Sequence, residues 1–232
     1  IESVVATADH VKAVLRSEKT IDISFDEWNV WYQERFHNED QITDIEQWPY
    51  APRLLEDAYH VADAVVVGSL LISLLKHADR VTSASLAQLV NVIAPIMTEP
   101  GGPAWRQTTF FPFALTSRLA RGSALRVELS SETYRTTEHG DVPLVDAVAT
   151  HDPETGATAV FLVNRAIEGP TTVTVDARSL GDVRVLETHT LNDDDPYAVN
   201  TLAEPTRVAP VANKSALLQD GVLTIELPPV SW

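Results

Sequence analysis

Two carboxylates, Asp26 and Glu27, are followed within four residues by two tryptophans, Trp28 and Trp31. A carboxylate can attack or protonate a glycosidic bond, and an indole can stack on the apolar face of a sugar ring. Residues 21–25, just before them, alternate apolar and polar side chains, which is the period of a β-strand. The sequence therefore places the residue types of a sugar-cleaving site at the end of a predicted strand.

The stretch Phe25-Asp26-Glu27-Trp28-Asn29-Val30-Trp31 resembles the nucleophile segment of glycoside hydrolase family 51, the α-L-arabinofuranosidases. The resemblance continues in order along the chain, through residues 60–64, 77–81, 87–96, 101–108 and 227–232. It implies that the chain is the C-terminal portion of such an enzyme. Residues 1–122 would then be the last strands and helices of a (β/α)8 TIM barrel, and residues 123–232 an antiparallel, jelly-roll-like β-sandwich.

The same resemblance implies roles for three residues. Glu27 would be the nucleophile of a retaining mechanism, Gln88 would hydrogen-bond the sugar, and Trp31 would line the pocket. The family's second catalytic carboxylate belongs to an Asn-Glu pair on an earlier strand, and no such pair next to a strand pattern precedes Glu27. The acid/base residue is therefore expected in an upstream segment that also completes the barrel, and this chain alone is expected to be inactive.

Simple alternation along the strand makes Asp26 a rival to Glu27. Glu27 has the parity of the apolar Ile23 and Phe25, whereas Asp26 has the parity of the polar Ser24. Either the apolar side faces the barrel interior, or a bulge near Phe25 turns the chain. The resemblance favours Glu27 as the nucleophile, with Asp26 as a supporting carboxylate.

Three functions remain open from these residues. The first is a retaining α-L-arabinofuranosidase that removes terminal arabinofuranosyl units from arabinoxylan, arabinan or their oligosaccharides. The second is another retaining glycosidase of the same clan, such as a xylosidase or an endoglucanase. The third is a non-catalytic carbohydrate-binding β-sandwich that carries a barrel remnant, although such a module needs no nucleophile.

The composition argues against several other classes of protein function. The 232 residues are 44% hydrophobic and carry a formal net charge of −16, which argues against a nucleic-acid partner. There is no cysteine, and the histidines lack metal-ligand spacing, so neither a metal nor a cofactor is expected. The longest apolar stretch, 62–75, is too short for a bilayer. The family resemblance also implies that the protein is cytoplasmic and forms a homo-oligomer.

Helical and strand periods alternate in the first half of the chain, as they do in βα units. The predicted order is helix 3–17, strand 21–25, helix 54–77, strand 81–88 and helix 109–121. Gly122 is expected to end the last helix, and His60 and His77 are expected to be satisfied helix residues. The loop 32–53 is either a wall of the substrate cleft or a packed surface loop.

Short runs rich in Val, Thr and Leu follow, separated by turn signals, and they predict an all-β sandwich or barrel. These runs are 125–129, 144–150, 158–164, 171–176, 183–191 and 222–227. The face with Val160, Leu162, Val183 and Val185 is expected to be buried. The acidic stretch 192–196 lacks the glycine and glutamate of a calcium loop and is expected to be an exposed turn.

Overall fold

The computed structural model describes residues 1–34 and 52–232, so most of the predicted loop 32–53 lies outside the described residues. The first half of the chain mixes helices with short strands. Its elements are α1 (Glu2–Leu15), β1 (Ile23–Trp28), α3 (Val61–Lys76), β2 (Val81–Leu86), β3 (Ile96–Thr98), β4 (Ala104–Arg106) and α4 (Phe110–Leu119).

The second half is built mainly of antiparallel strands. They are β5 (Ser123–Leu125), β6 (Thr133–Thr136), β7 (Gly140–Pro143), β8 (Val145–His151), β9 (Thr158–Asn164), β10 (Thr171–Asp176), β11 (Leu217–Gln219) and β12 (Val222–Leu227), with a 3-10 turn, η1, at Arg178–Leu180. One sheet has the order β5-β8-β9, a second has the order β10-β12-β11, and β6 and β7 form a hairpin.

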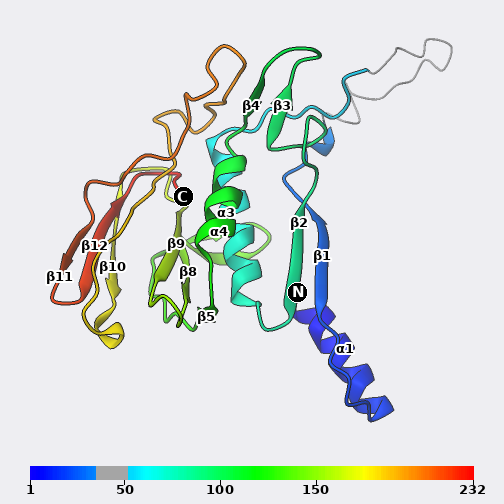
Figure 1. Ribbon diagram of the computed structural model, residues 1–232, viewed down its shortest axis with the longest axis vertical. Helices are drawn as coiled ribbons and strands as arrows, with labels where there is room; N and C mark the ends of the chain where they lie inside the picture. Colours follow the sequence, from blue (N-terminus) through cyan, green and yellow to red (C-terminus); the bar gives the residue numbers. More distant parts are fainter. Residues whose placement is uncertain (35–51) are drawn as a thin grey trace.

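Strands β1 and β2 form a parallel pair that α3 connects, which is the βα arrangement that the sequence predicts. Figure 1 shows the layers side by side: the β10-β12-β11 sheet, then the β5-β8-β9 sheet, then α3 and α4, then β1 and β2. Both parallel strands run toward the end of the molecule where α3 begins and where the β3–β4 hairpin lies. The ends of β1 and β2 that could carry chemistry therefore lie at that end.

Helix α3 is shorter than predicted, because it begins at Val61 and not near residue 54. His60 caps it, and the His60 side chain and Asp63 form a reciprocal capping box. The next two backbone N–H groups, of Val61 and Ala62, donate to the carbonyls of Ala198 and Pro196. Carbonyl groups of a loop far along the chain thus accept hydrogen bonds from the first turn of the helix. Local periodicity cannot reveal such contacts.

Helix α1 is confirmed, but its apolar residues are not buried. Val4, Val11, Val14 and Leu15 are all exposed. The helix is tied to the parallel pair by Arg80, whose guanidinium donates to Asp9 at 2.8 Å and to the Ile21 carbonyl at 2.9 Å. No described helix has the length and apolar character to cross a membrane.

The predicted strands 158–164, 171–176 and 222–227 are confirmed, and the run at 144–150 is β8 shifted by one residue. The predicted strand 125–129 is wrong except at Leu125, because β5 spans Ser123–Leu125 and residues 126–129 belong to no strand. The predicted strand 183–191 is wrong, because this segment makes a single bridge, from Thr190 to Val211. Residues 183–189 belong to no strand, and Leu191 exchanges backbone hydrogen bonds with Trp232. Periodicity cannot show whether a segment finds a partner strand.

The predicted buried face of the β-rich part is also wrong. Val160 is 37% exposed and Val185 43% exposed, whereas Phe161 and Val163 pack against α3. Strand β9 is apolar on both faces, so the position of α3 decides which face is buried. The expected apolar seam is confirmed, since one core cluster joins α3 to the second half; it includes Val61, Ala64, Val65, Ile72, Val148, Phe161, Val163, Leu191 and Trp232.

Gly122 lies three residues beyond Leu119, where α4 ends, and the cap of the helix is Ala120 and not the predicted glycine. The φ of Gly122 is +75°, and a Cβ there would meet the backbone carbonyl of His151 on β8. The glycine thus allows the connection between α4 and β5 to approach β8 closely. Because this core is continuous across residue 122, the domain boundary at that residue stays a prediction.

Candidate active site

A β-bulge sets the direction of the two carboxylates. Phe25 pairs with Ala84 and Trp28 with Leu86, so three steps along β1 oppose two along β2. The extra residue lies at Asp26–Glu27. It allows Phe25 and Trp28, which have opposite parity, to pack in the same cluster against Val67 and Leu71 of α3.

Asp26 and Glu27 are both exposed, while their neighbour Trp28 is buried. The bulge is one of the two alternatives that simple alternation leaves open, and both carboxylates lie on the exposed part of the strand. The Ser24 hydroxyl donates to one carboxylate oxygen of Asp26. This contact gives Asp26 a partner on its own strand, and the roles of Asp26 and Glu27 stay predictions.

Gln88 follows β2 and is exposed, and the Ala87–Gln88 peptide bond is cis. The backbone N–H of Ala87 donates to the carbonyl of Trp28 at 3.0 Å, and the N–H of Gln88 donates to the carbonyl of Ile93 at 3.1 Å. The Ala87–Trp28 hydrogen bond brings the segment of Gln88 beside the segment of Glu27. The two predicted site residues therefore lie at the ends of adjacent strands, since Glu27 is the last residue but one of β1 and Gln88 comes two residues after β2.

Asn29 fixes the turn after β1. Its side-chain amide donates to the carbonyls of Ala87 and Ile93, and its Oδ1 accepts the N–H of Val30 at 2.8 Å. One side chain therefore joins the chain after Glu27 to the loop that carries Gln88. Asn29 belongs to the motif that resembles the family, but nothing in the sequence indicates this holding role, because its partners lie 58 and 64 positions away.

Trp31 lies one residue past this turn and is 41% exposed. The backbone on either side of it is held by buried side chains from the segment that leads into α3. The Tyr59 hydroxyl donates to the Val30 carbonyl at 2.7 Å, and the Tyr32 N–H donates to Asp57 Oδ2 at 3.2 Å. The indole is therefore presented from a fixed loop.

Tyr32, His60 and Asp63 form a connected polar group at the start of α3. The Tyr32 hydroxyl donates to Asp63 Oδ2 at 2.6 Å and lies 3.0 Å from His60 Nε2. Burial and the hydrogen bond to Asp63 raise the pKa of Tyr32, and burial together with the charge of Asp57 raises the pKa of Tyr59. Both phenols are therefore neutral donors and not candidate bases.

His60 and His77 have the satisfied helix roles that the sequence predicts. His60 is the N-cap of α3, while His77 is its C-cap and has Nδ1 2.8 Å from the carbonyl of Ser73. Within residues 1–34 and 52–232, no group of three or more His, Asp or Glu side chains could hold a metal ion. In the acidic stretch, Asp194 and Asp195 are exposed, whereas Asp193 is partly buried against Arg207.

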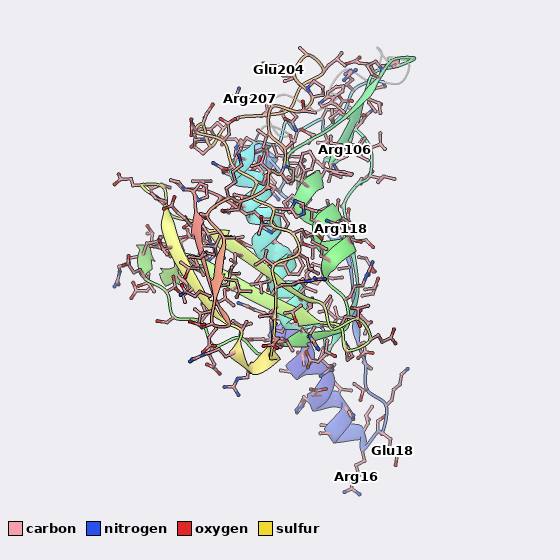
Figure 2. The ribbon with its side chains drawn as sticks, turned by 60° about the vertical axis from the view of Figure 1, so that its left-hand side comes forward. Arg16, Glu18, Arg106, Arg118, Glu204 and Arg207 are labelled. Atoms are coloured by element: carbon pink, nitrogen blue, oxygen red, sulfur yellow. The ribbon has the colours of Figure 1, made fainter. Side chains whose placement is uncertain are left out.

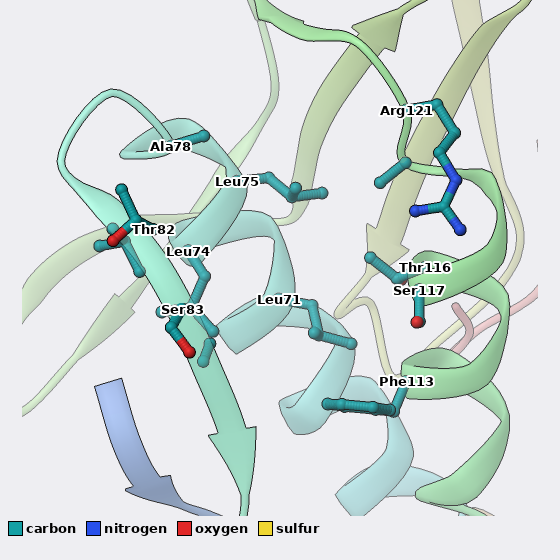
Figure 3. A pocket seen from close by; sticks show the side chains of 13 residues that line it. Leu71, Leu74, Leu75, Ala78, Thr82, Ser83, Phe113, Thr116, Ser117 and Arg121 are labelled. Carbon is teal, nitrogen blue, oxygen red and sulfur yellow. The ribbon is translucent and has the colours of Figure 1, made fainter. Parts of the chain in front are cut away.

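A separate cavity of about 280 Å³ lies between α3, β2 and α4. Figure 3 shows Leu71, Leu75 and Phe113 around it, with the Arg121 guanidinium at its rim. Its lining is mostly aliphatic, and it contains neither Glu27, Gln88 nor Trp31. The cavity is a gap between packed elements and does not belong to the carboxylate site.

Comparison with known proteins gives one consistent result. A family model described as the alpha-L-arabinofuranosidase C-terminal domain matches residues 26–231. An intracellular exo-alpha-(1->5)-L-arabinofuranosidase of Streptomyces lividans is 56% identical over 232 residues, which is all of this chain and 34% of that protein. An exo-alpha-(1->6)-L-arabinofuranosidase of Bifidobacterium longum is 50% identical, again over all of this chain and over 45% of that protein.

Solved structures agree. A family 51 alpha-L-arabinofuranosidase from Bifidobacterium longum superposes with a TM-score of 0.91 at 46% identity and covers all of this chain and 44% of that one. A GH51 arabinofuranosidase from Xanthomonas axonopodis pv. citri gives a TM-score of 0.70 at 28% identity, over 90% of this chain and 40% of that one. The chain thus spans less than half the length of these relatives.

Proposed function

The chain belongs to the α-L-arabinofuranosidases of glycoside hydrolase family 51, and on that premise we propose that Glu27 is the nucleophile of a retaining glycosidase. The Glu27 carboxylate attacks the anomeric carbon of an arabinofuranosyl unit and forms a covalent glycosyl-enzyme. A second carboxylate, in an upstream segment of the same enzyme, first protonates the leaving oxygen and then activates a water molecule. The chain alone is inactive in this proposal.

The observation that supports this assignment most directly is the bulge in β1. It turns Glu27 away from the apolar side of Phe25 and Trp28, at the C-terminal end of a parallel strand pair. In barrels of alternating strands and helices, chemistry is carried by that end of the strands. We therefore assign β1–α3–β2 to the closing turns of a (β/α)8 barrel, and residues 123–232 to a jelly-roll-like sandwich that supports it.

Gln88 and Trp31 complete the proposed sugar site. Gln88 follows the neighbouring strand, and the Ala87–Trp28 hydrogen bond keeps its segment beside that of Glu27. Its amide can donate to a sugar hydroxyl and accept from one. Trp31 offers a half-exposed indole on a fixed loop, which suits stacking on the apolar face of the ring.

The proposed substrates are arabinan, arabinoxylan or their oligosaccharides, from which terminal α-L-arabinofuranosyl residues are removed. Relatives are named for exo action on α-(1→5) or α-(1→6) linkages, and several are named intracellular. We therefore infer exo action inside the cell, and a homo-oligomeric enzyme as the family resemblance implies.

The test uses the complete enzyme with Glu27→Ala. Loss of the nucleophile should reduce kcat on p-nitrophenyl α-L-arabinofuranoside by several orders of magnitude, because the covalent route is closed. Azide should restore part of the rate and give a product of inverted configuration, since a small anion can replace the missing carboxylate. Asp26→Asn is the matched control, because it neutralises the adjacent carboxylate and should retain most of the activity.

Near-normal turnover by Glu27→Ala, together with an inactive Asp26→Asn enzyme, would reverse the assignment. A product of inverted configuration from the unmodified enzyme would exclude the retaining mechanism as a whole.

A further inference from the structure

The four residues after β1 are held to the rest of the structure by side chains. Asn29 is bound to the β2–β3 loop through the carbonyls of Ala87 and Ile93. The carbonyl of Val30 accepts from the Tyr59 hydroxyl, and the N–H of Tyr32 donates to Asp57. Trp31 lies at the centre of this segment.

We propose that Tyr59 and Tyr32 are positioning residues that set the place of the Trp31 indole in the sugar site. The inference rests on the proposed function, in which Trp31 stacks on the sugar. Tyr59 acts on the residue before Trp31 through the Val30 carbonyl. Tyr32, directly after Trp31, is fixed by its backbone N–H on Asp57 and by its hydroxyl on Asp63.

The anchoring groups are themselves rigid. Gln107 accepts the N–H of Tyr59 at 2.9 Å and donates to the carbonyls of Asp57 and Ala94 at 2.9 and 2.8 Å. The Thr108 hydroxyl lies 2.7 Å from the carbonyl of His60 and 3.1 Å from that of Tyr59. A loop held by such a cluster has little freedom to change its position.

The polar side chains of this cluster are buried, which calls for a physical reason. Tyr59 is fully buried, and Asp57, Asp63 and Gln107 are almost fully buried. Burying polar groups is costly unless each finds a partner, and apolar residues could fill the same space more simply. A polar cluster whose hydrogen bonds are all made can select a single position of the loop, because hydrogen bonds are directional. Apolar contacts are not directional and do not select one position in this way. That position is the one from which the half-exposed indole of Trp31 projects.

A purely structural role for Tyr59 is the competing explanation, so the test must measure Trp31 itself. The complete enzyme is labelled with 5-fluorotryptophan, and the Trp31 resonance is identified by its absence in Trp31→Phe. Tyr59→Phe removes only the hydroxyl that holds Val30, and Tyr32→Phe removes only the hydroxyl that holds Asp63 and His60. Tyr134→Phe, on β6 and outside the cluster, is the matched control.

We expect Tyr59→Phe to shift or broaden the Trp31 resonance and to leave the other tryptophan resonances in place. The KM for p-nitrophenyl α-L-arabinofuranoside should rise about fivefold, the equivalent of one hydrogen bond, with kcat changed much less. Tyr32→Phe should act in the same direction, which keeps the test valid if one variant folds poorly. Tyr134→Phe should change neither quantity.

A Trp31 resonance that is unchanged in folded Tyr59→Phe and Tyr32→Phe would overturn the inference. A uniform loss of kcat with an unmoved resonance would also overturn it. A failure of the proposed function gives a different result. In that case, adding L-arabinose to the unmodified enzyme would not change the Trp31 resonance.

Discussion

One extra residue in β1 decides where the Glu27 carboxylate lies. Without the bulge, Glu27 would share the side of Phe25 and face the helix layer. With it, Phe25 and Trp28 both pack against α3, and the residues between them are exposed. Bulges occur often beside active sites because they re-aim a side chain without ending the strand. Here the shift leaves the Glu27 carboxylate exposed and outside the core.

Gln88 allows a prediction at the scale of one residue. Its backbone N–H is held by the Ile93 carbonyl, so the exposed side chain can be removed without loss of that contact. Gln88→Ala in the complete enzyme should lower kcat/KM by about ten- to a hundredfold, as expected when hydrogen bonds to a sugar are lost. The Tm should change by less than about 2 °C.

Steady-state kinetics and calorimetry measure the two effects. Leu89→Ala, at the exposed neighbouring position, is the control and should leave kcat/KM nearly unchanged. Equal losses in the two variants would remove Gln88 from the proposed sugar site.

The motif around Glu27 contains the proposed site residues but not the residues that hold them. Glu27 and Trp31 lie four positions apart in the sequence, and the strand pattern predicts that Gln88 ends the neighbouring strand. Tyr59 and Gln107 could not be found in this way, because each is an ordinary polar residue whose partner is many positions away. Buried polar clusters depend on tertiary contacts, which leave no period in the sequence.

Helix α3 lies between the parallel pair of the first half and the β5-β8-β9 sheet of the second. One of its faces packs on Phe25 and Trp28 of β1, and another on Phe161 and Trp232 of the second half. Its periodicity predicts a helix. Its starting residue could not be predicted, because the capping carbonyls come from Pro196 and Ala198.

Gly68 gives a prediction at the scale of this element. Alanine favours a helix interior over glycine by about 1 kcal/mol, so propensity alone predicts that Gly68→Ala stabilises the enzyme. A Cβ at this position would meet Cδ1 of the buried Trp232 indole. We expect the overlap to prevail, with a net loss of about 1–3 kcal/mol and a lower Tm.

Thermal unfolding of the complete enzyme measures this change. Val66→Ala, on the same helix but 46% exposed, is the control and should be nearly neutral. Trp232→Phe combined with Gly68→Ala should cost less than the sum of the two single changes, since the smaller ring removes the overlap. A raised Tm in Gly68→Ala would show that the helix and Trp232 separate freely.

At the scale of the whole molecule, surface contacts connect the halves in addition to the shared core. Arg118 of α4 binds Glu187 of the second half through both carboxylate oxygens, at 3.1 and 3.0 Å. Lys76 of α3 forms an ion pair with Asp146 of β8. The loop at 193–200, which caps α3, also joins the two halves. Figure 2 shows Arg118 on α4, and it shows Arg207 and Glu204 at the end of the molecule where α3 begins.

The capping loop is shaped by its own aspartates. Asp193 Oδ1 accepts the N–H of Asp195 at 3.0 Å and lies 3.4 Å from the Arg207 guanidinium, and Asp195 Oδ1 accepts the N–H of Tyr197 at 2.9 Å. The ring of Tyr197 then meets His60 edge-on, with ring centroids 5.1 Å apart. The second half thus supports the site through the start of α3 and carries no reactive group in this proposal.

The pH dependence of stability tests this division of roles through Asp193. The hydrogen bond from the Asp195 N–H, together with Arg207, lowers the pKa of Asp193 below its usual value. A carboxyl whose pKa falls on folding adds stability above its unfolded pKa of about 3.9, and that stability is lost as pH falls through the folded pKa. Asp193→Asn should therefore lower the Tm at pH 7 by about 1–3 °C, and this effect should shrink steadily as the pH falls below about 3.9.

Asp194→Asn removes the same charge from the exposed neighbouring position and is the control, with little effect at either pH. For both variants kcat/KM at pH 7 should stay within about threefold of the unmodified enzyme, because surface changes far from the reacting atoms rarely do more. Thermal scans of the complete enzyme from pH 3 to pH 7 measure the first effect, and steady-state kinetics the second. A large loss of kcat/KM in folded Asp193→Asn would show that the capping loop reaches the sugar, so that the second half takes part in substrate binding.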